Sequence, residues 1–319
     1  MRLLIVLLAL VPTLVFSQGY PGKPVKMIIP FAPGGASDTV GRIFQARLAE
    51  LLGQPIVIEN RAGASGNLGL EAAARSAPDG YTIYLGNVGT IAINPGIFRS
   101  LAVNPTKDFI AVTQIVDVPG ALIAHPSFPP NSIKEMIAYV KANPGKINFA
   151  SPGSGSQNRL EMEVIKKAEA LDMVHVPYKG GAGPAAAGLI AGETHMMFST
   201  VSSVLGHIKA GRLKALAVVS GKRLEQLPDV PTMVESGYPD SKSGSWQGIF
   251  VPAGTPKDIV DRLYAVMVQT MKSADVVDRL SKNGIDVVLS PSPAAFTEYV
   301  ATETVRWGKV AKESGATVD

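Results

Sequence analysis

The chain has 319 residues, of which 46% are hydrophobic and 18% are charged, and its 32 Gly and 24 Pro punctuate the backbone. This composition and the absence of a sequence repeat exclude intrinsically disordered, collagen-like and solenoid proteins. The net charge of +4 includes no basic run longer than a pair, which argues against nucleic-acid binding, and the lack of Cys excludes disulfides, thiolate metal sites and thiol catalysis.

The N-terminus carries the pattern of an export signal. Arg2 precedes an apolar run, Leu3–Phe16, which is too short to span a membrane. Val15 and Ser17 are small residues of the kind that signal peptidase prefers. We therefore predict that residues 1–17 are a signal peptide and that the mature protein is exported.

The first part of the mature chain alternates short β-branched segments with helical patterns. The predicted strands are Val25–Phe31, Ile56–Glu59, Thr82–Leu85, Ile110–Ile115 and Leu122–Ala124, and the predicted helices are Ser37–Leu52 and Ser65–Ser76. Such alternation favours parallel sheets that are covered by helices on both faces.

From His125 onward the pattern restarts, with Ser132 and Glu135 forming a capping box ahead of a helix. Further strands are predicted at Ile147–Ala150, Val174–Val176, Thr194–Phe198 and Leu213–Val219, with a helix that places Leu160, Val164, Ala168 and Leu171 on one face and others at Pro184–Ala191 and ending near Gly211. A stretch rich in Pro, Gly and Ser leads to a helix after Thr255 and to a last strand and helix.

A chain of this length should divide, because single hydrophobic cores stop growing at roughly 250–300 residues. The restart near His125 and the polar stretch that ends at Gly248 place the boundaries. We predict two α/β lobes, each a mainly parallel sheet flanked by helices. Lobe 1 comprises residues 18–123 and 249–319, and lobe 2 comprises residues 124–248.

Two glycine-rich loops occupy equivalent places between a buried strand and a helix start, at Pro33–Asp38 and Ser151–Ser156. A helix start leaves N–H groups unpaired and carries roughly half a positive charge, so two starts that face one cleft would bind an anion. Glycine lets the backbone approach a ligand closely. Hydroxyl groups at Ser37, Ser151, Ser154 and Ser156 could add donors. The alternative is that both loops are ordinary capped turns.

Signatures of catalysis are missing from the sequence. There is no Walker A motif, HExxH or GxSxG, and the 4 His residues are scattered without the spacing of metal ligands. Asp38 would repel an anion at a helix start, so its expected role is to cap the helix or hold the loop, although it could receive a ligand amine.

The sequence resembles the tripartite tricarboxylate transporter substrate-binding proteins, the Bug family of periplasmic receptors, over nearly the whole mature chain. The resemblance rests on Pro30–Gly35 with Asp38 and Arg42, Glu59–Ala64, Asp79–Gly80, Ser151–Ser156, Val176–Gly181, Leu227–Thr232 and Pro252–Pro256, in that order. It implies a fold of the type II periplasmic-binding-protein kind, with a ligand cleft between the lobes.

The resemblance also implies which residues bind ligand. Both glycine-rich loops would grip one carboxylate, and the segments Asn87–Thr90 and Ser199–Ser202 would line the rest of the cleft. Arg159 stands where the family usually has His, and it could pair with a second carboxylate or point to solvent. The expected ligand contacts are Phe31, Gly34, Gly35, Ser37, Asp38, Asn87, Thr90, Ser151, Ser154, Gly155, Ser156, Arg159 and Thr200.

The function implied is that of a monomeric periplasmic receptor that closes about a hinge on a small mono- or dicarboxylate and delivers it to a membrane permease, without catalysis, cofactor or metal. Two alternatives stay open at the sequence level. The scaffold could serve a secreted hydrolase or isomerase, or the loaded receptor could signal to a membrane sensor kinase.

Overall fold

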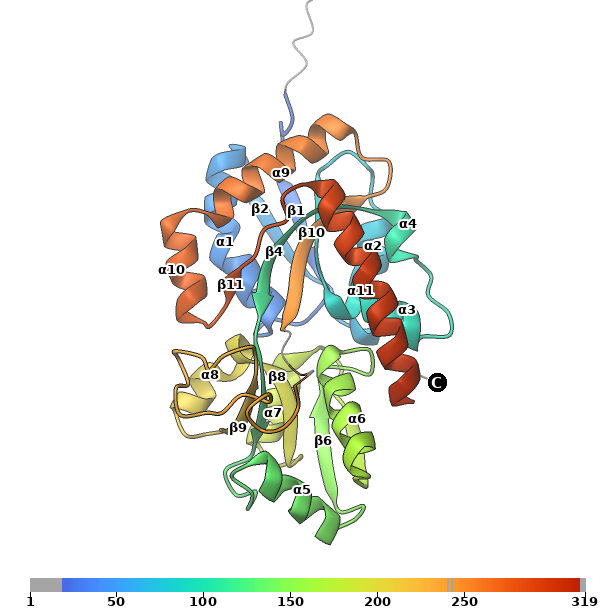
Figure 1. Ribbon diagram of the computed structural model, residues 1–319. Coiled ribbons are helices and arrows are strands. Elements are labelled where there is room, and N and C mark those ends of the chain that lie inside the picture. Colours follow the sequence, from blue (N-terminus) through green and yellow to red (C-terminus); the bar gives the residue numbers. More distant parts are fainter. Residues whose placement is uncertain (1–18, 240, 242–243, 316–319) are drawn as a thin grey trace, which may run out of the picture.

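The computed structural model describes residues 19–239, 241 and 244–315, and these form two α/β lobes, one above the other in Figure 1. The two-lobed architecture predicted from the sequence is confirmed. The predicted signal peptide, residues 1–17, lies outside the described residues. None of the described helices combines the length and the apolar character that a membrane span requires.

Lobe 1 is built on a six-stranded sheet of order β11-β4-β10-β3-β1-β2. β1 pairs in parallel with β2 and β3, whereas β10 runs antiparallel to β3 and β4, and β11 runs antiparallel to β4. The sheet is therefore mixed and not mainly parallel, because the returning strand β10 inserts between β3 and β4. The strands are β1 (Val25–Ile29), β2 (Ile56–Asn60), β3 (Thr82–Asn87), β4 (Phe109–Val118), β10 (Ser245–Pro252) and β11 (Asp286–Val287).

Helices cover both faces of this sheet and bury two separate apolar clusters. One cluster joins the sheet to α1, α9 and α10, and the other joins it to α2, η2, α3 and α11. The bounds are α1 (Ala36–Leu52), η1 (Ala64–Gly66), α2 (Asn67–Ala74), η2 (Gly89–Ile93), α3 (Asn94–Ile97), α4 (Pro105–Asp108), α9 (Lys257–Met271), α10 (Ala274–Lys282) and α11 (Pro293–Ser314).

Lobe 2 repeats this plan on a five-stranded mixed sheet of order β7-β6-β8-β5-β9. β6 is parallel to β7 and β8, while β5 is antiparallel to β8 and β9. Helices α5 and α6 cover one face, and α7 and α8 cover the other. The elements are β5 (Gly120–Ala124), α5 (Ile133–Ala142), β6 (Ile147–Ser151), α6 (Gln157–Glu169), β7 (Met173–Pro177), α7 (Ala182–Ile190), β8 (Met196–Thr200), α8 (Val201–Lys209) and β9 (Lys214–Val219).

The chain crosses between the sheets at two neighbouring points, and both predicted boundaries fall a few residues late. β4 belongs to the first sheet and β5 to the second, so the first crossing lies at Pro119 and not after residue 123. The return precedes Ser245, because all of β10 pairs in the first sheet. The first point was placed late because the restart of the pattern was recognised only at His125, after β5, and the second because the polar stretch was followed to Gly248 although β10 begins at Ser245.

The predicted start of helix α5 was confirmed. The Ser132 hydroxyl accepts the Glu135 N–H at 3.2 Å, as the capping box predicts. The stripe predicted on α6 was half right. Leu160 and Leu171 are buried, whereas Val164 and Ala168 are exposed, and Met162 and Ile165 supply the helix's contacts with the lobe 2 core. Leu160 packs into the lobe 1 cluster instead, so α6 contacts the cores of both lobes.

Candidate functional site

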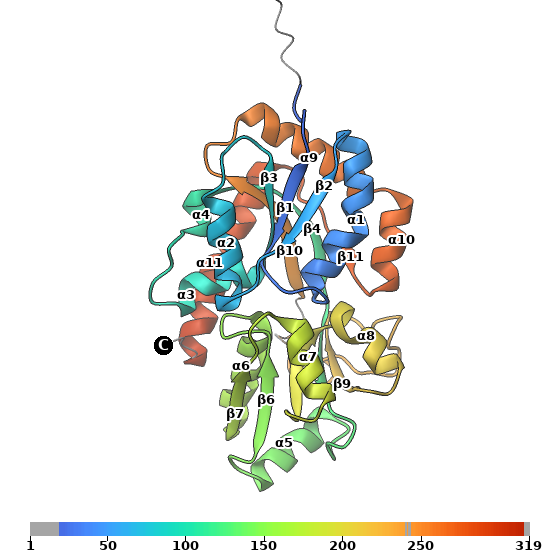
Figure 2. The ribbon, with the colours of Figure 1, turned by 180° about the vertical axis from the view of Figure 1, so that it is seen from behind.

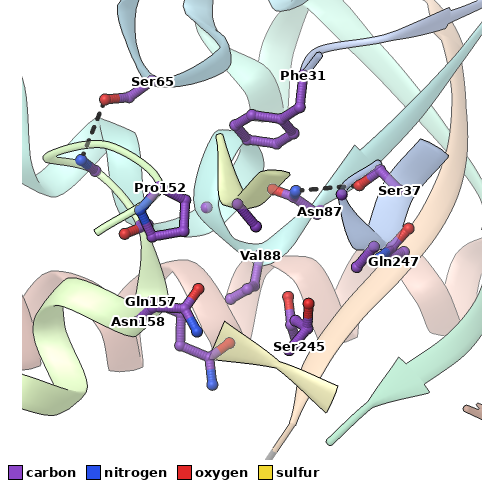
Figure 3. A pocket seen from close by; sticks show the side chains of 17 residues that line it. Phe31, Ser37, Ser65, Asn87, Val88, Pro152, Gln157, Asn158, Ser245 and Gln247 are labelled. Carbon is purple, nitrogen blue, oxygen red and sulfur yellow. Dashed lines mark hydrogen bonds between the residues drawn. The ribbon is translucent and has the colours of Figure 1, made fainter. Parts of the chain in front are cut away.

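A small cavity of about 60 Å³ lies between the lobes. That volume holds roughly four to six water-sized groups. The cavity lies at the carboxyl ends of β1, β3, β6 and β8, where open α/β sheets bind ligands. Figure 3 shows its lining, which consists of Phe31, Gly35, Ala36, Ser37, Ser65, Asn87, Val88, Gly89, Pro152, Gly155, Ser156, Gln157, Asn158, Ala182, Thr200, Ser245 and Gln247.

Several helices begin at this cavity. α1 contributes its first turn, α6 its N-cap and first residues, α7 its first residue and α8 its N-cap, so both lobes take part. Figure 2 shows α7 and α8 at the junction below the lower end of α1. No side chain caps α1, α7 or α8, and within the described chain the N–H groups of Ala36, Ser37 and Ala182 donate no hydrogen bond.

The lining carries no Asp, Glu, Lys, Arg or His. The electrostatic character of the cavity therefore comes from the helix starts, each with roughly half a positive charge and unpaired N–H donors. The two lobes direct these partial charges at one small volume. An anion that enters would be paired by backbone N–H groups, whereas a cation would find no side chain of opposite charge.

The structure brings seven of the predicted ligand contacts to the cavity lining, namely Phe31, Gly35, Ser37, Asn87, Gly155, Ser156 and Thr200. They lie at the ends of β3 and β8 or in the segments that follow β1 and β6. Asn87 is held by its neighbours, because its Oδ1 accepts the Thr90 N–H at 3.0 Å and its Nδ2 lies 3.5 Å from Ser37 Oγ. The second of these contacts is dashed in Figure 3.

Asp38 was predicted as a ligand contact but lies behind the loop. Its carboxylate accepts from Arg42 Nε at 2.9 Å, from the Gly34 N–H at 3.1 Å and from Asn60 Nδ2 at 3.1 Å. Burial raises the pKa of Asp38, but these hydrogen bonds outweigh it and lower the pKa overall. The ion pair thus holds the shape of the loop, and the Gly34 N–H is used within it.

The other predicted residues that do not line the cavity support those that do. Thr90 is fully buried and orients Asn87. Ser151 lies 2.7 Å through its Oγ from His175 Nε2, and burial together with Arg159 and Lys166 lowers the pKa of that ring to about 4. Ser154 offers its carbonyl oxygen to Arg159.

Arg159 neither lines the cavity nor points to solvent. Its side chain is largely buried, and its Nη1 donates to the Ser154 carbonyl at 3.1 Å while its Nε lies 3.6 Å from Glu163 Oε1. Burial lowers the pKa of Arg159, and Glu163 opposes that change. The guanidinium therefore braces the loop Ser151–Ser156 from behind.

The lobes touch around the cavity, and we refer to this arrangement as the closed form. The Gly155 N–H of lobe 2 donates to Ser65 Oγ of lobe 1 at 3.3 Å, a contact that is dashed in Figure 3. The Ala32 N–H donates to the Gly180 carbonyl at 2.9 Å. Gly155 also lies so close to Asn94 that a Cβ there would be 1.9 Å from Asn94 Oδ1.

Sequence reasoning missed part of the lining. Ser65 and Ala182 follow glycine-containing stretches, Glu59–Ala64 and Val176–Gly181, that carried the family resemblance. Ser245 and Gln247 had no signal, because the sequence analysis predicts no strand here and places both residues in the polar stretch that ends at Gly248. Only the pairing of β10 with β3 brings these polar residues to the cavity.

A larger groove of about 670 Å³ runs between α6 and α11 on the outside of the molecule. Its lining is mostly apolar and includes no start of a helix, so it lacks the features of a small-anion site. Among the described residues no group of three or more His, Cys, Asp or Glu could hold a metal ion.

The comparisons with known proteins agree with this geometry. Residues 40–316 match the profile of the tripartite tricarboxylate transporter family receptor. The chain is 35% identical over 303 residues to protein BugT of Bordetella pertussis, covering 95% of this chain and 92% of BugT.

Solved structures extend the likeness to three dimensions. The periplasmic binding protein BugD superposes with a TM-score of 0.88 at 34% identity, over 93% of this chain and 99% of BugD. MatC of Rhodopseudomonas palustris, solved with bound malate, superposes with a TM-score of 0.86 at 34% identity, over 91% of this chain and 99% of MatC. The chain therefore belongs to the tripartite tricarboxylate transporter receptor family and is a Bug-type solute-binding protein.

Proposed function

We propose that this protein is a periplasmic receptor that closes on a small mono- or dicarboxylate and delivers it to the membrane permease of a tripartite transporter. The observation that carries the proposal is the convergence of uncapped helix starts from both lobes on a cavity without charged side chains. A carboxylate has two oxygens that accept several N–H bonds at once, and it fits the small volume.

The relative MatC was solved with malate, which supports a carboxylate as the ligand class for this chain as well. The cavity also favours binding over turnover, because its lining offers no His, Asp, Glu, Lys or Cys that could act as a general base or a strong nucleophile. Membership of the receptor family supports the proposed periplasmic location and the proposed permease partner, and the predicted signal peptide fits that location.

The energetics are adequate for a receptor. Hydrogen bonds to a charged group contribute about 1.5–3 kcal/mol each, and micromolar affinity corresponds to about −8 kcal/mol. A few such bonds, after the cost of ordering the ligand, supply this affinity. Since contacts from lobe 1 and lobe 2 meet only when the lobes approach, ligand binding shifts the protein towards the closed form. The closed form is what a permease would recognise.

The proposal is tested by thermal-shift screening of the mature protein against aliphatic and aromatic carboxylates of two to eight carbon atoms. Binding to the native state raises its apparent stability, by about 2.7 kcal/mol at a ligand concentration of a hundred times the dissociation constant. Mass spectrometry of each hit before and after incubation checks for turnover. A rise in melting temperature with unchanged ligand supports a receptor, whereas product in excess of protein supports the hydrolase or isomerase alternative.

The partner is tested separately. Ligand-loaded and ligand-free protein are used to capture membrane proteins from the organism that encodes the chain. Selective capture of a transporter permease by the loaded form supports delivery. Selective capture of a sensor kinase would replace the transport part of the proposal and leave ligand binding intact.

A further inference from the structure

Gln247 lines the cavity but is not paired by the protein. It is only 1% exposed, and its Oε1 is buried without a hydrogen-bond partner among the described residues. Such an unpaired buried polar group destabilises a protein unless something else pairs it. The side chain is labelled at the edge of the cavity in Figure 3.

The strand pattern explains how Gln247 reaches this place. On β10 the side chains alternate, so Ser245 and Gln247 lie on the cavity side while Trp246 points away, where its Nε1 donates to Glu303 at 3.0 Å. Gln247 is the cross-strand partner of Asn87 on β3. Cross-strand partners lie close enough for their side chains to contact one ligand group together.

These residues form an uncharged polar wall on lobe 1, which we define as Ser245, Gln247 and Asn87. Asn87 is already held by the Thr90 N–H, whereas the amide of Gln247 can rotate about its last torsion, which is soft. The rotation presents either an acceptor oxygen or a donor NH₂ group to the cavity. The wall has no charge with which to pair a ligand ammonium group.

We propose that Gln247 selects carboxylates that carry a hydroxyl group on their carbon chain. This proposal rests on the proposed function as a carboxylate receptor. A hydroxyl both donates and accepts, so it pairs with the amide in either orientation, whereas a bare methylene leaves the amide unpaired. The helix starts then bind the carboxylate group, and the polar wall contacts the rest of the ligand. Gln247 is thus a specificity-determining residue.

The test compares matched ligands on the mature protein by calorimetry. The pairs are 3-hydroxybutyrate against butyrate and malate against succinate, which differ only in one hydroxyl. For at least one pair, the hydroxylated acid should bind about 10- to 100-fold more tightly, the range expected when a buried amide gains or loses its partner. In Gln247→Leu the ratio should fall to about twofold or less.

Two controls keep the test sharp. Gln269→Leu makes the same change at an exposed position on α9 and should leave the ratio unchanged. If Gln247→Leu does not fold, Gln247→Met replaces it, because an unbranched side chain of similar volume fills the site with less strain.

The outcomes are distinguishable. A wild-type ratio near one for pairs in which both acids bind would overturn the role of Gln247 and leave the receptor proposal standing. A ratio that survives in Gln247→Leu would assign the selectivity to another residue. Failure of all these acids and of the wider carboxylate screen to bind would remove the proposed function itself.

Discussion

Substitution of Gly155 by Ala should separate closure of the lobes from folding. The three atoms nearest to a Cβ built at Gly155 belong to Asn94 and Phe98, at distances of 1.9 Å and 3.0 Å for Asn94 and 3.1 Å for Phe98. Gly155 belongs to lobe 2 and both neighbours belong to lobe 1. The clash therefore exists only in the closed form.

The cost of the clash can be worked from what holds Asn94 in place. Asn94 is fully buried, and its Nδ2 donates to the Ser65 carbonyl at 3.1 Å and to Asn67 Oδ1 at 2.6 Å. To make room for the methyl group, Asn94 must give up these bonds or the lobes must move apart. Two lost hydrogen bonds cost about 1–3 kcal/mol in the closed form, which lowers the apparent affinity roughly 5- to 150-fold.

The assay compares Gly155→Ala with Gly206→Ala on α8, which does not line the cavity. A Cβ at Gly206 would meet nothing outside its own helix within 4 Å. Calorimetry with the best carboxylate should show weakened binding for Gly155→Ala and near wild-type binding for Gly206→Ala. Thermal unfolding without ligand should differ little between Gly155→Ala and wild type. Wild-type affinity in Gly155→Ala would refute the reasoning, and so would loss of its fold.

Three further substitutions test separate parts of the site. Thr200→Asp supplies a good N-cap to α8 but adds negative charge to the cavity, so carboxylate binding should be lost at calorimetric detection while the melting temperature holds. Asp38→Asn removes the charge that pairs with Arg42, and urea unfolding should show a loss of about 1–3 kcal/mol; an unchanged midpoint would contradict its structural role. Glu161→Gln should flatten the pH dependence of stability, because burial raises the pKa of Glu161 to about 8 in the folded protein against the opposing effect of Arg306. The folded state then keeps a proton that the unfolded chain releases above about pH 4.5. The free energy of unfolding of the wild type should therefore fall as the pH rises from 4.5 to 8, by up to about 1.4 kcal/mol per pH unit. Urea titrations at several pH values would show whether that slope is present in the wild type and reduced in Glu161→Gln.

The parts of the site that could be predicted are those encoded locally. A buried strand followed by Gly and Ser and then by an amphipathic helix places a helix start at a sheet edge, which is why Gly35, Ser37, Gly155 and Ser156 were found from the sequence. The same pattern could not separate residues that face the cavity from those behind it. Asp38 belongs to the same loop as Ser37 but turns towards Arg42, a choice that depends on packing.

The parts that could not be predicted depend on distant pairing. β10 lies between β3 and β4 in the sheet, although about 130 residues separate it from β4 along the chain. Its sequence does not indicate which strands it pairs with or in which direction it runs. This insertion makes the first sheet mixed and brings Gln247 to the cavity. The stripe on α6 failed in part for a related reason, because Leu160 packs against the other lobe and the periodicity was read as one core.

The measurement that tests the central claim most directly compares a carboxylate with its own primary amide. The two differ in charge but little in shape, so calorimetry of the mature protein isolates the contribution of the helix starts. We predict that the best-bound acid binds at least about 100-fold more tightly than its amide, since two or more charge-assisted bonds weaken together. Equal binding of acid and amide would contradict the account.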